Sequence, residues 1–219
     1  MNIDGTGLAE IPLGLQMFGT PQFTPNNESI IFYGADALSS GLFEVRLADL
    51  QTRTISALVE DESGFAVSPN GTHLAYYEMD RNLGEARLVI EEFATGNKAV
   101  QATASIPQGS GSSLPQSANL SWSPSGNFLT FKLGRGASDR FVYLVSTDRP
   151  GPIKVADSAH APAFSADGDC LAYISNKQVF LLDLTSKNAT PLFLADLPTG
   201  RSIADYQLDK LQWGAELVP

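Results

Sequence analysis

The chain holds few of the side chains that carry nucleophilic or metal chemistry, and these lie far apart in the sequence. Its two histidines are His73 and His160 and its single cysteine is Cys170, so no cluster has the spacing of a zinc site. Asp167-Gly168-Asp169 resembles a fragment of a calcium loop but lacks the alternating acids and the terminal Glu. We therefore expect no metal and no cofactor, and interpret these residues as structural.

Serine-hydrolase chemistry would require a nucleophile on a tight Gly-x-Ser-x-Gly elbow, together with a histidine and an acid. No such elbow occurs in the sequence. The stretch Gly109-Ser110-Gly111-Ser112-Ser113 contains no lysine, so it does not fit a phosphate-binding loop either. We interpret it as a polar loop and predict no catalytic residues.

The overall composition excludes further classes of function. The chain has 219 residues, 43% of them hydrophobic and 17% charged, which is typical of a globular protein. Its formal net charge is −10, so nucleic acid is a poor candidate partner. No apolar stretch is long enough to span a membrane, so we expect no membrane insertion.

The elements that must position any site are set by a repeat. An apolar or aromatic residue is followed by Ser or Thr, a small turn and a β-rich apolar run, in copies that begin about 42 to 55 residues apart. Four copies are present, and a fifth begins at Leu211-Gln212-Trp213-Gly214. The four are Phe23–Asn27, Val67–Gly71, Trp122–Gly126 and Phe164–Gly168.

Each copy is followed by two more strand-like runs, which gives four strands per repeat and leaves little room for helix. The predicted third strands are Leu42–Leu47, Ala86–Ile90, Phe141–Val145 and Val179–Leu182. The predicted fourth strands are Arg53–Leu58, Lys98–Ala102, Ile153–Ala156 and Thr190–Leu194, with a turn predicted over 147–151. Four-stranded units at this period predict an all-β protein with the fold of a β-propeller.

The motifs Trp122-Ser123-Pro124-Ser125-Gly126 and Val67-Ser68-Pro69-Asn70-Gly71 resemble the Trp-Ser-Pro-Asp-Gly core of the TolB-like propeller repeat, a relative of the tryptophan–aspartate repeat. The resemblance implies four-stranded antiparallel blades. It also implies contacts with partner proteins and a periplasmic or extracellular location, as for the periplasmic TolB proteins. Similar propellers cap serine peptidases of the prolyl-oligopeptidase kind, and the motif is structural in all of them.

We expect one propeller domain over residues 1–219, with complete blades at 18–62, 63–117, 118–158 and 159–208. Residues 1–17 resemble the outer strand of a closing or preceding blade, and residues 209–219 resemble an inner strand. Two interpretations stay open. The two ends share a partial fifth blade, or the chain is a segment of a larger propeller.

The expected function is a non-catalytic scaffold that binds a protein or peptide partner through the loops on one face. These loops join fourth to first strands and second to third strands, and such loops commonly carry function. The alternative is an accessory propeller of a larger enzyme, such as a prolyl-oligopeptidase-like peptidase. The candidate partner-binding residues are Asp80, Arg81, Arg135, Asp139, Arg140, His160, Asp205 and Tyr206.

Overall fold

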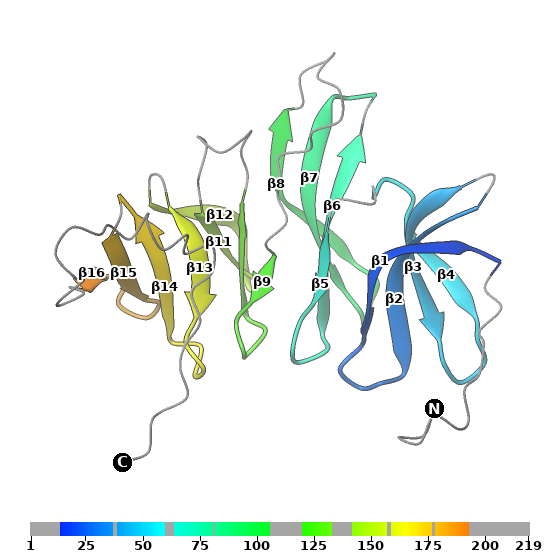
Figure 1. The fold of residues 1–219 in the computed structure, drawn as a ribbon, viewed down its shortest axis with the longest axis horizontal. Helices are drawn as coiled ribbons and strands as arrows, with labels where there is room; N and C mark the ends of the chain where they lie inside the picture. Colours follow the sequence, from blue (N-terminus) through cyan, green and yellow to red (C-terminus); the bar gives the residue numbers. More distant parts are fainter. Residues whose placement is uncertain are drawn as a thin grey trace, which may run out of the picture. The chain divides into compact units, whose positions relative to one another are not determined.

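The structure is a computed structural model that describes residues 14–36, 39–59, 64–80, 82–105, 120–132, 142–156, 159–176 and 178–192. Within these ranges the chain forms sixteen strands and no helix (Figure 1). The strands form four sheets of four, and in each sheet every strand pairs antiparallel with its neighbours in the chain. The predicted fifth, partial blade lies outside the described residues.

The chain divides into two compact units, one ending at Asp61 and one beginning at Glu62. The described part of the first unit is sheet 1. Its strands, in order across the sheet, are β1 (Gln16–Phe23), β2 (Ser29–Ala35), β3 (Ser40–Arg46) and β4 (Thr52–Ser56).

The second unit contains the other three sheets. Sheet 2 consists of β5 (Phe65–Val67), β6 (His73–Asp80), β7 (Glu85–Glu92) and β8 (Lys98–Ser105). Sheet 3 consists of β9 (Ser121–Trp122), β10 (Phe128–Lys132), β11 (Val142–Ser146) and β12 (Arg149–Ala156). Sheet 4 consists of β13 (His160–Phe164), β14 (Cys170–Ser175), β15 (Gln178–Asp183) and β16 (Ala189–Leu192).

The predicted four-strand repeat is confirmed, with small shifts at the strand ends. The largest shift concerns the turn predicted over 147–151. The turn itself covers only Thr147 and Asp148, and β12 begins at Arg149. Gly151, with a φ of 99°, lies inside the strand where the pairing of β11 with β12 is irregular between Leu144 and Ser146. Pro and Gly are common at such irregular edge positions, so they mark a bulged edge strand here instead of a turn.

A buried hydroxyl closes the turn between the first and second strands of every sheet. The Ser or Thr of the motif accepts a hydrogen bond through its side-chain oxygen from the backbone N–H five residues later, at 2.8 to 3.0 Å. The pairs are Thr24 with Ser29, Ser68 with His73, Ser123 with Phe128, and Ser165 with Cys170. This is why the motif requires a hydroxyl at that position.

The last residue of each motif turn adopts a left-handed backbone. Its φ is 56° at Asn27, 70° at Gly71, 75° at Gly126 and 80° at Gly168. Gly adopts this conformation without strain, and Asn tolerates it better than most side chains. Three copies accordingly use Gly and the first uses Asn.

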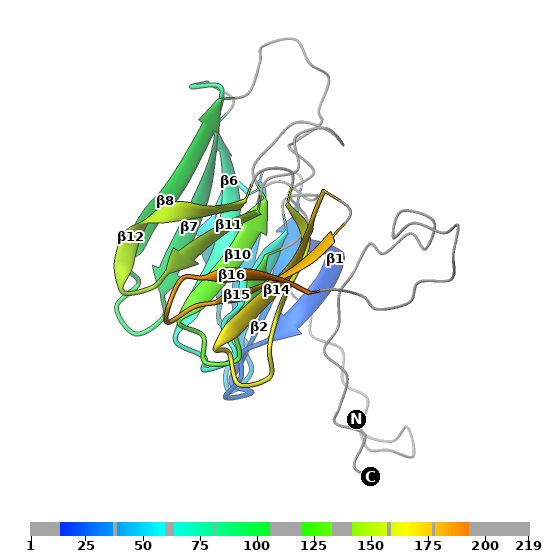
Figure 2. The ribbon, with the colours of Figure 1, turned by 90° about the vertical axis from the view of Figure 1, so that its left-hand side faces the viewer.

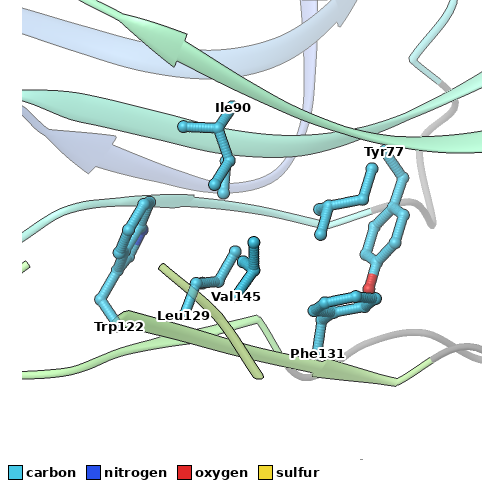
Figure 3. Close-up of a cluster of buried hydrophobic side chains, with 8 residues drawn as sticks. Tyr77, Ile90, Trp122, Leu129, Phe131 and Val145 are labelled. Carbon is cyan, nitrogen blue, oxygen red and sulfur yellow. The ribbon is translucent and has the colours of Figure 1, made fainter. Parts of the chain in front are cut away.

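The core of the second unit lies between adjacent sheets. Ala75, Tyr77, Leu88 and Ile90 of sheet 2 pack against side chains of sheet 3 (Figure 3). The partners from sheet 3 are Trp122, Leu129, Phe131 and Val145. The outer strands β8 and β12 also lie next to one another (Figure 2).

Sheets 3 and 4 are joined by a second cluster. Val142 of sheet 3 and Tyr173 of sheet 4 are both buried in it, and the ring of Tyr173 stacks on that of Phe180 with 5.4 Å between centroids. A single sheet leaves its apolar faces open to water, so it must pack against another sheet. Burial of apolar surface between neighbouring sheets therefore stabilises a unit of this kind.

Candidate functional site

The second unit has two edges that differ in character. At one edge lie the motif turns of sheets 2, 3 and 4, at 68–71, 123–126 and 165–168, together with the turns between third and fourth strands. We call this the turn edge. The opposite edge, where second strands lead to third strands and fourth strands lead to the next sheet, is here called the loop edge. The antiparallel strand order places these connections at opposite ends of each sheet.

Contacts between neighbouring turns fix the turn edge. The side-chain amide of Asn70 donates to the backbone oxygen of Ser125 at 2.9 Å. A methyl group added at Gly126 would lie 2.5 Å from the amide of Asn70, and one at Gly168 would lie 3.5 Å from the ring of Pro124. The three motif turns therefore pack against one another in order.

Asp80, a predicted partner-binding residue, lies at the loop edge as the last residue of β6. Its Oδ1 accepts hydrogen bonds from the backbone N–H groups of Asn82 and Leu83, at 3.1 and 3.0 Å. Its Oδ2 lies 3.5 Å from the guanidinium of Arg87, which also contacts Glu85 at 3.1 Å. Asp80 thus shapes the hairpin between β6 and β7 and holds a cation across it.

Arg87 belongs to this group, yet sequence reasoning did not select it. Arg87 lies in the predicted strand Ala86–Ile90, but Glu85 lies just before it; in β7 the two residues alternate and therefore point to the same face of the sheet. The ion pair with Asp80 depends on the register of β6 with β7, in which Asp80 pairs with Glu85. The hairpin exposes Leu83, which has 63% of its surface accessible.

His160 also lies at the loop edge, as the first residue of β13. It pairs with Ile174, and the register then shifts before Ala163 pairs with Ala172. Ala161, within this bulge, is buried and has a φ of 50°, which is strained for a residue with a side chain. Bulges commonly re-aim a neighbouring side chain, and His160 is the last paired residue before this one.

The other candidate residues lie outside the described ranges. These are Arg81, Arg135, Asp139, Arg140, Asp205 and Tyr206. Their participation in partner binding stays a prediction. Two of the eight candidates, Asp80 and His160, are thus placed by the structure, and both are at the loop edge of the second unit.

A buried acid is found on β7. Glu91 has only 1% of its surface accessible, and it accepts a hydrogen bond from the hydroxyl of Tyr76 at 3.3 Å. The ammonium of Lys98 lies 3.7 Å from the same carboxylate oxygen and 5.7 Å from the centre of the Tyr76 ring. Since β7 pairs with β8 at Glu91 and Lys98, the two side chains meet across the ladder. A buried charge that is paired in this way is compatible with a structural role.

Cys170 is the single thiol of the chain, and its surroundings disfavour the thiolate. Partial burial raises the pKa of the Cys170 thiol, and the negative charges of Asp183, Asp167 and Asp169 raise it further. A thiol acts as a nucleophile through its thiolate, so these surroundings make Cys170 a poor nucleophile at neutral pH.

Across the described ranges, no three His, Cys, Asp or Glu side chains converge as a metal site would require. In the same ranges, no helix has the length and apolar character needed to cross a membrane.

Comparison with solved structures identifies the architecture. The chain is similar to TolB from Acinetobacter baumannii, with a TM-score of 0.51 and 16% identity over 82% of this chain and 44% of that one. It is similar to an oligogalacturonate lyase solved with manganese, with a TM-score of 0.55 and 16% identity over 82% of this chain and 53% of the lyase. The chain spans about half the length of these two structures.

A prolyl endopeptidase gives a TM-score of 0.51 at 13% identity, over 83% of this chain and 30% of the peptidase. No family model matches the sequence, and no curated protein matches it. Similarity at these identities shows the fold alone. The chain has a TolB-like β-propeller fold, and the sequence prediction of that fold is confirmed. The same fold occurs in proteins that are enzymes and in TolB.

Proposed function

We propose, on the premise of the TolB-like propeller fold, that this chain is a non-catalytic scaffold that binds a protein or peptide partner through its loop edge. The observation that carries the proposal is the division between the two edges. The repeated motif uses its hydroxyl groups to close turns at one edge, and the amide of Asn70 joins two neighbouring turns there. The two longest connections between described strands, 106–120 and 133–141, join strand ends that lie at the other edge.

The composition of these connections supports a binding role. The stretch 133–141 contains Arg135, Asp139 and Arg140, and the hairpin of β6 and β7 presents the exposed Leu83 beside the ion pair of Asp80 with Arg87. Apolar groups bordered by charged groups are the usual composition of a transient protein interface. A rigid set of sheets that carries variable connections is the usual support for such a surface.

Site-specific photo-crosslinking tests the proposal. A photoreactive amino acid is placed at Leu83 or Arg140 for the loop edge, and at Thr72 or Thr95 for the turn edge, in the full chain expressed in its native host. We expect protein adducts from the loop-edge positions, and we expect the adducts formed from Leu83 to disappear when Asp139 and Arg140 are both replaced by Ala. Adducts from the turn edge alone, or from neither edge, would contradict the proposal.

A second candidate is an accessory propeller of a larger enzyme. It is favoured by the similarity to a prolyl endopeptidase, of which this chain covers 30%. Reading the coding sequence on both sides of this chain separates the two candidates. An α/β-hydrolase domain in the same reading frame would support the accessory propeller, and stop codons at both borders would exclude it.

A further inference from the structure

A groove of about 290 Å³ opens at the turn edge of the second unit, between sheets 3 and 4. This volume is close to the lower end of the range for ligand-binding clefts, about 300 to 1,000 Å³. Sheet 3 contributes residues from β10, β11 and β12 and from the turn at Asp148, and sheet 4 contributes Leu184 and Lys187 from the turn after β15. The groove therefore lies at the opposite edge from the loops proposed above to bind a partner.

The interior of the groove is apolar. Phe128, Leu144, Ile153 and Leu184 line it, and Leu144 is almost completely buried. Ile153 lies on the outermost strand of its sheet and leaves 59% of its surface accessible. Covering such an exposed aliphatic side chain with an apolar group of a ligand is favourable, because it removes apolar surface from water.

Two cations border this apolar surface. Arg149 and Lys187 both line the groove and are both exposed. Across the described residues, no carboxylate lies within ion-pair distance of either of them. The chain as a whole carries ten more acidic than basic charges, whereas the two cations of this groove outnumber its one carboxylate, that of Asp148, so the groove is a local site of opposite sign. This arrangement is complementary to an apolar group that carries an adjacent anion.

The backbone beside the groove disfavours strand addition. β12 lies at the edge of its sheet, and Pro150 and Pro152 have no N–H to donate to a further strand. A ligand at this edge therefore receives no ladder hydrogen bond from these two positions. The relevant contacts are the apolar surface and the two cations.

We propose that this groove binds an acidic peptide segment of a partner protein. An apolar side chain of the peptide packs against Ile153 and Leu184, and a neighbouring carboxylate lies between Arg149 and Lys187. This surface is separate from the loop edge, so a chain with both could hold two partners, or two parts of one partner, at opposite edges.

Asp148 favours a peptide over a simple anionic amphiphile. Its carboxylate lines the same groove and is exposed, so it would repel a ligand that presents only negative charge. A peptide has backbone N–H groups for that carboxylate, as well as an acidic side chain for the cations. A fatty acid has no N–H group to offer.

The test is a selection of random peptides displayed on phage against the immobilised full chain, with counter-selection on the double variant R149Q/K187Q. We expect the enriched peptides to share an Asp or Glu next to Leu, Ile or Phe. For a synthesised peptide of this kind, the double variant should weaken binding about tenfold. Ile153→Asp should weaken it by more than about tenfold, since it removes apolar contact and adds a like charge.

Lys154→Gln is the matched control, because it removes the same charge from the same strand at a residue that does not line the groove; it should leave the affinity unchanged. Replacing the Glu of the peptide by Gln should weaken binding to the native chain and not to the double variant. If no enriched peptide depends on the two cations, the proposal is wrong. It is equally wrong if phosphatidylglycerol vesicles bind through Arg149 and Lys187 and no peptide does.

Failure here is distinguishable from failure of the loop-edge proposal. The variant R149Q/K187Q should retain the photo-crosslinks formed from Leu83 and Arg140. Loss of those crosslinks in the double variant would show that one surface serves both, which contradicts the separate groove.

Discussion

Two aspartates that close turns, Asp167 and Asp183, have a lowered pKa. Asp167 accepts from the hydroxyl of Ser165 and the N–H of Asp169, and these hydrogen bonds lower its pKa. Asp183 accepts from the backbone N–H of Ser186 at 2.7 Å and of Thr185 at 2.9 Å, and its pKa is lowered for the same reason. A carboxylate that accepts backbone hydrogen bonds is stabilised in its charged form.

This has a direct consequence for stability at acidic pH. A pKa lowered in the folded state means that the unfolded chain binds the proton first as the pH falls. The contribution of Asp167 to stability is therefore present above the ordinary aspartate pKa of about 3.9 and is lost as the pH falls through the lowered folded value. We expect the melting temperature to fall in that window.

Asp167→Asn isolates this contribution. Asn70 fills the equivalent position of sheet 2 and accepts from both Ser68 and Thr72, so an amide satisfies the same turn. The variant should melt near the native temperature at pH 7 and lose less stability between about pH 5 and pH 3 than the native chain. An unchanged pH dependence, measured by circular dichroism melts, would show that Asp167 contributes nothing to it.

Cys170 provides a second prediction at this scale. Its pKa is raised by burial first and by the neighbouring aspartates second, so less thiolate is present at a given pH. We expect its reaction with a disulfide reagent at pH 7 to 8 to be slower in the folded chain than in guanidinium. Equal rates in the folded chain and in guanidinium would contradict the raised pKa of the Cys170 thiol.

Among the elements, the first hairpin of each sheet shows what sequence can predict. Its turn depends only on residues within one short segment. These are a hydroxyl, an acceptor two residues later and a Gly or Asn with positive φ, so the motif alone predicts the turn. The bulge in β12 was not predicted, because Pro150 and Gly151 serve a turn and an irregular edge strand equally well. The difference is decided by pairing with β11.

Gly126→Ala and Gly168→Ala form a matched pair at this scale. Both place a methyl group on a backbone with positive φ, which costs about 1 to 2 kcal/mol. At Gly168 the added carbon meets only ordinary contacts, whereas at Gly126 it would lie 2.5 Å from the amide of Asn70. Gly126→Ala should therefore lose about 1 kcal/mol more, since it also breaks the bond from Asn70 to Ser125.

Urea unfolding of both variants measures this difference. Combining Gly126→Ala with Asn70→Ala is the control, because it removes the clash and the bond together. Equal destabilisation by the two glycine variants would show that the contact between neighbouring turns contributes nothing to stability.

At the scale of the whole molecule, the interfaces between sheets could not be derived from the repeat. The indole N–H of Trp122 donates to the backbone oxygen of Ala66 at 2.9 Å, which ties the innermost strand of sheet 3 to that of sheet 2. The motif predicts the aromatic residue but not its acceptor in another repeat. The groove beside Arg149 and Lys187 was missed for the same reason, because residues of two repeats line it.

Trp122→Phe tests the interface between sheets 2 and 3. The substitution leaves the oxygen of Ala66 without this donor and removes part of a buried ring, at a cost of about 1 to 3 kcal/mol. Tyr173→Phe is the control in the cluster between sheets 3 and 4, and it should change the free energy of unfolding by less than about 0.5 kcal/mol. Equal losses in urea unfolding would argue against a special role for the indole.

The hydroxyl that closes each motif turn has a consequence for how such a chain can arise. Every hydrogen bond that this hydroxyl makes lies within a stretch of six residues, from Thr24 to Ser29 or from Ser68 to His73. A hydroxyl whose bonds all lie within its own bend needs no matching change in the neighbouring bends when the coding segment is duplicated. Gene duplication can therefore add or remove sheets while this hydroxyl stays satisfied, and later divergence is left to contacts between copies, such as that of Asn70 with Ser125.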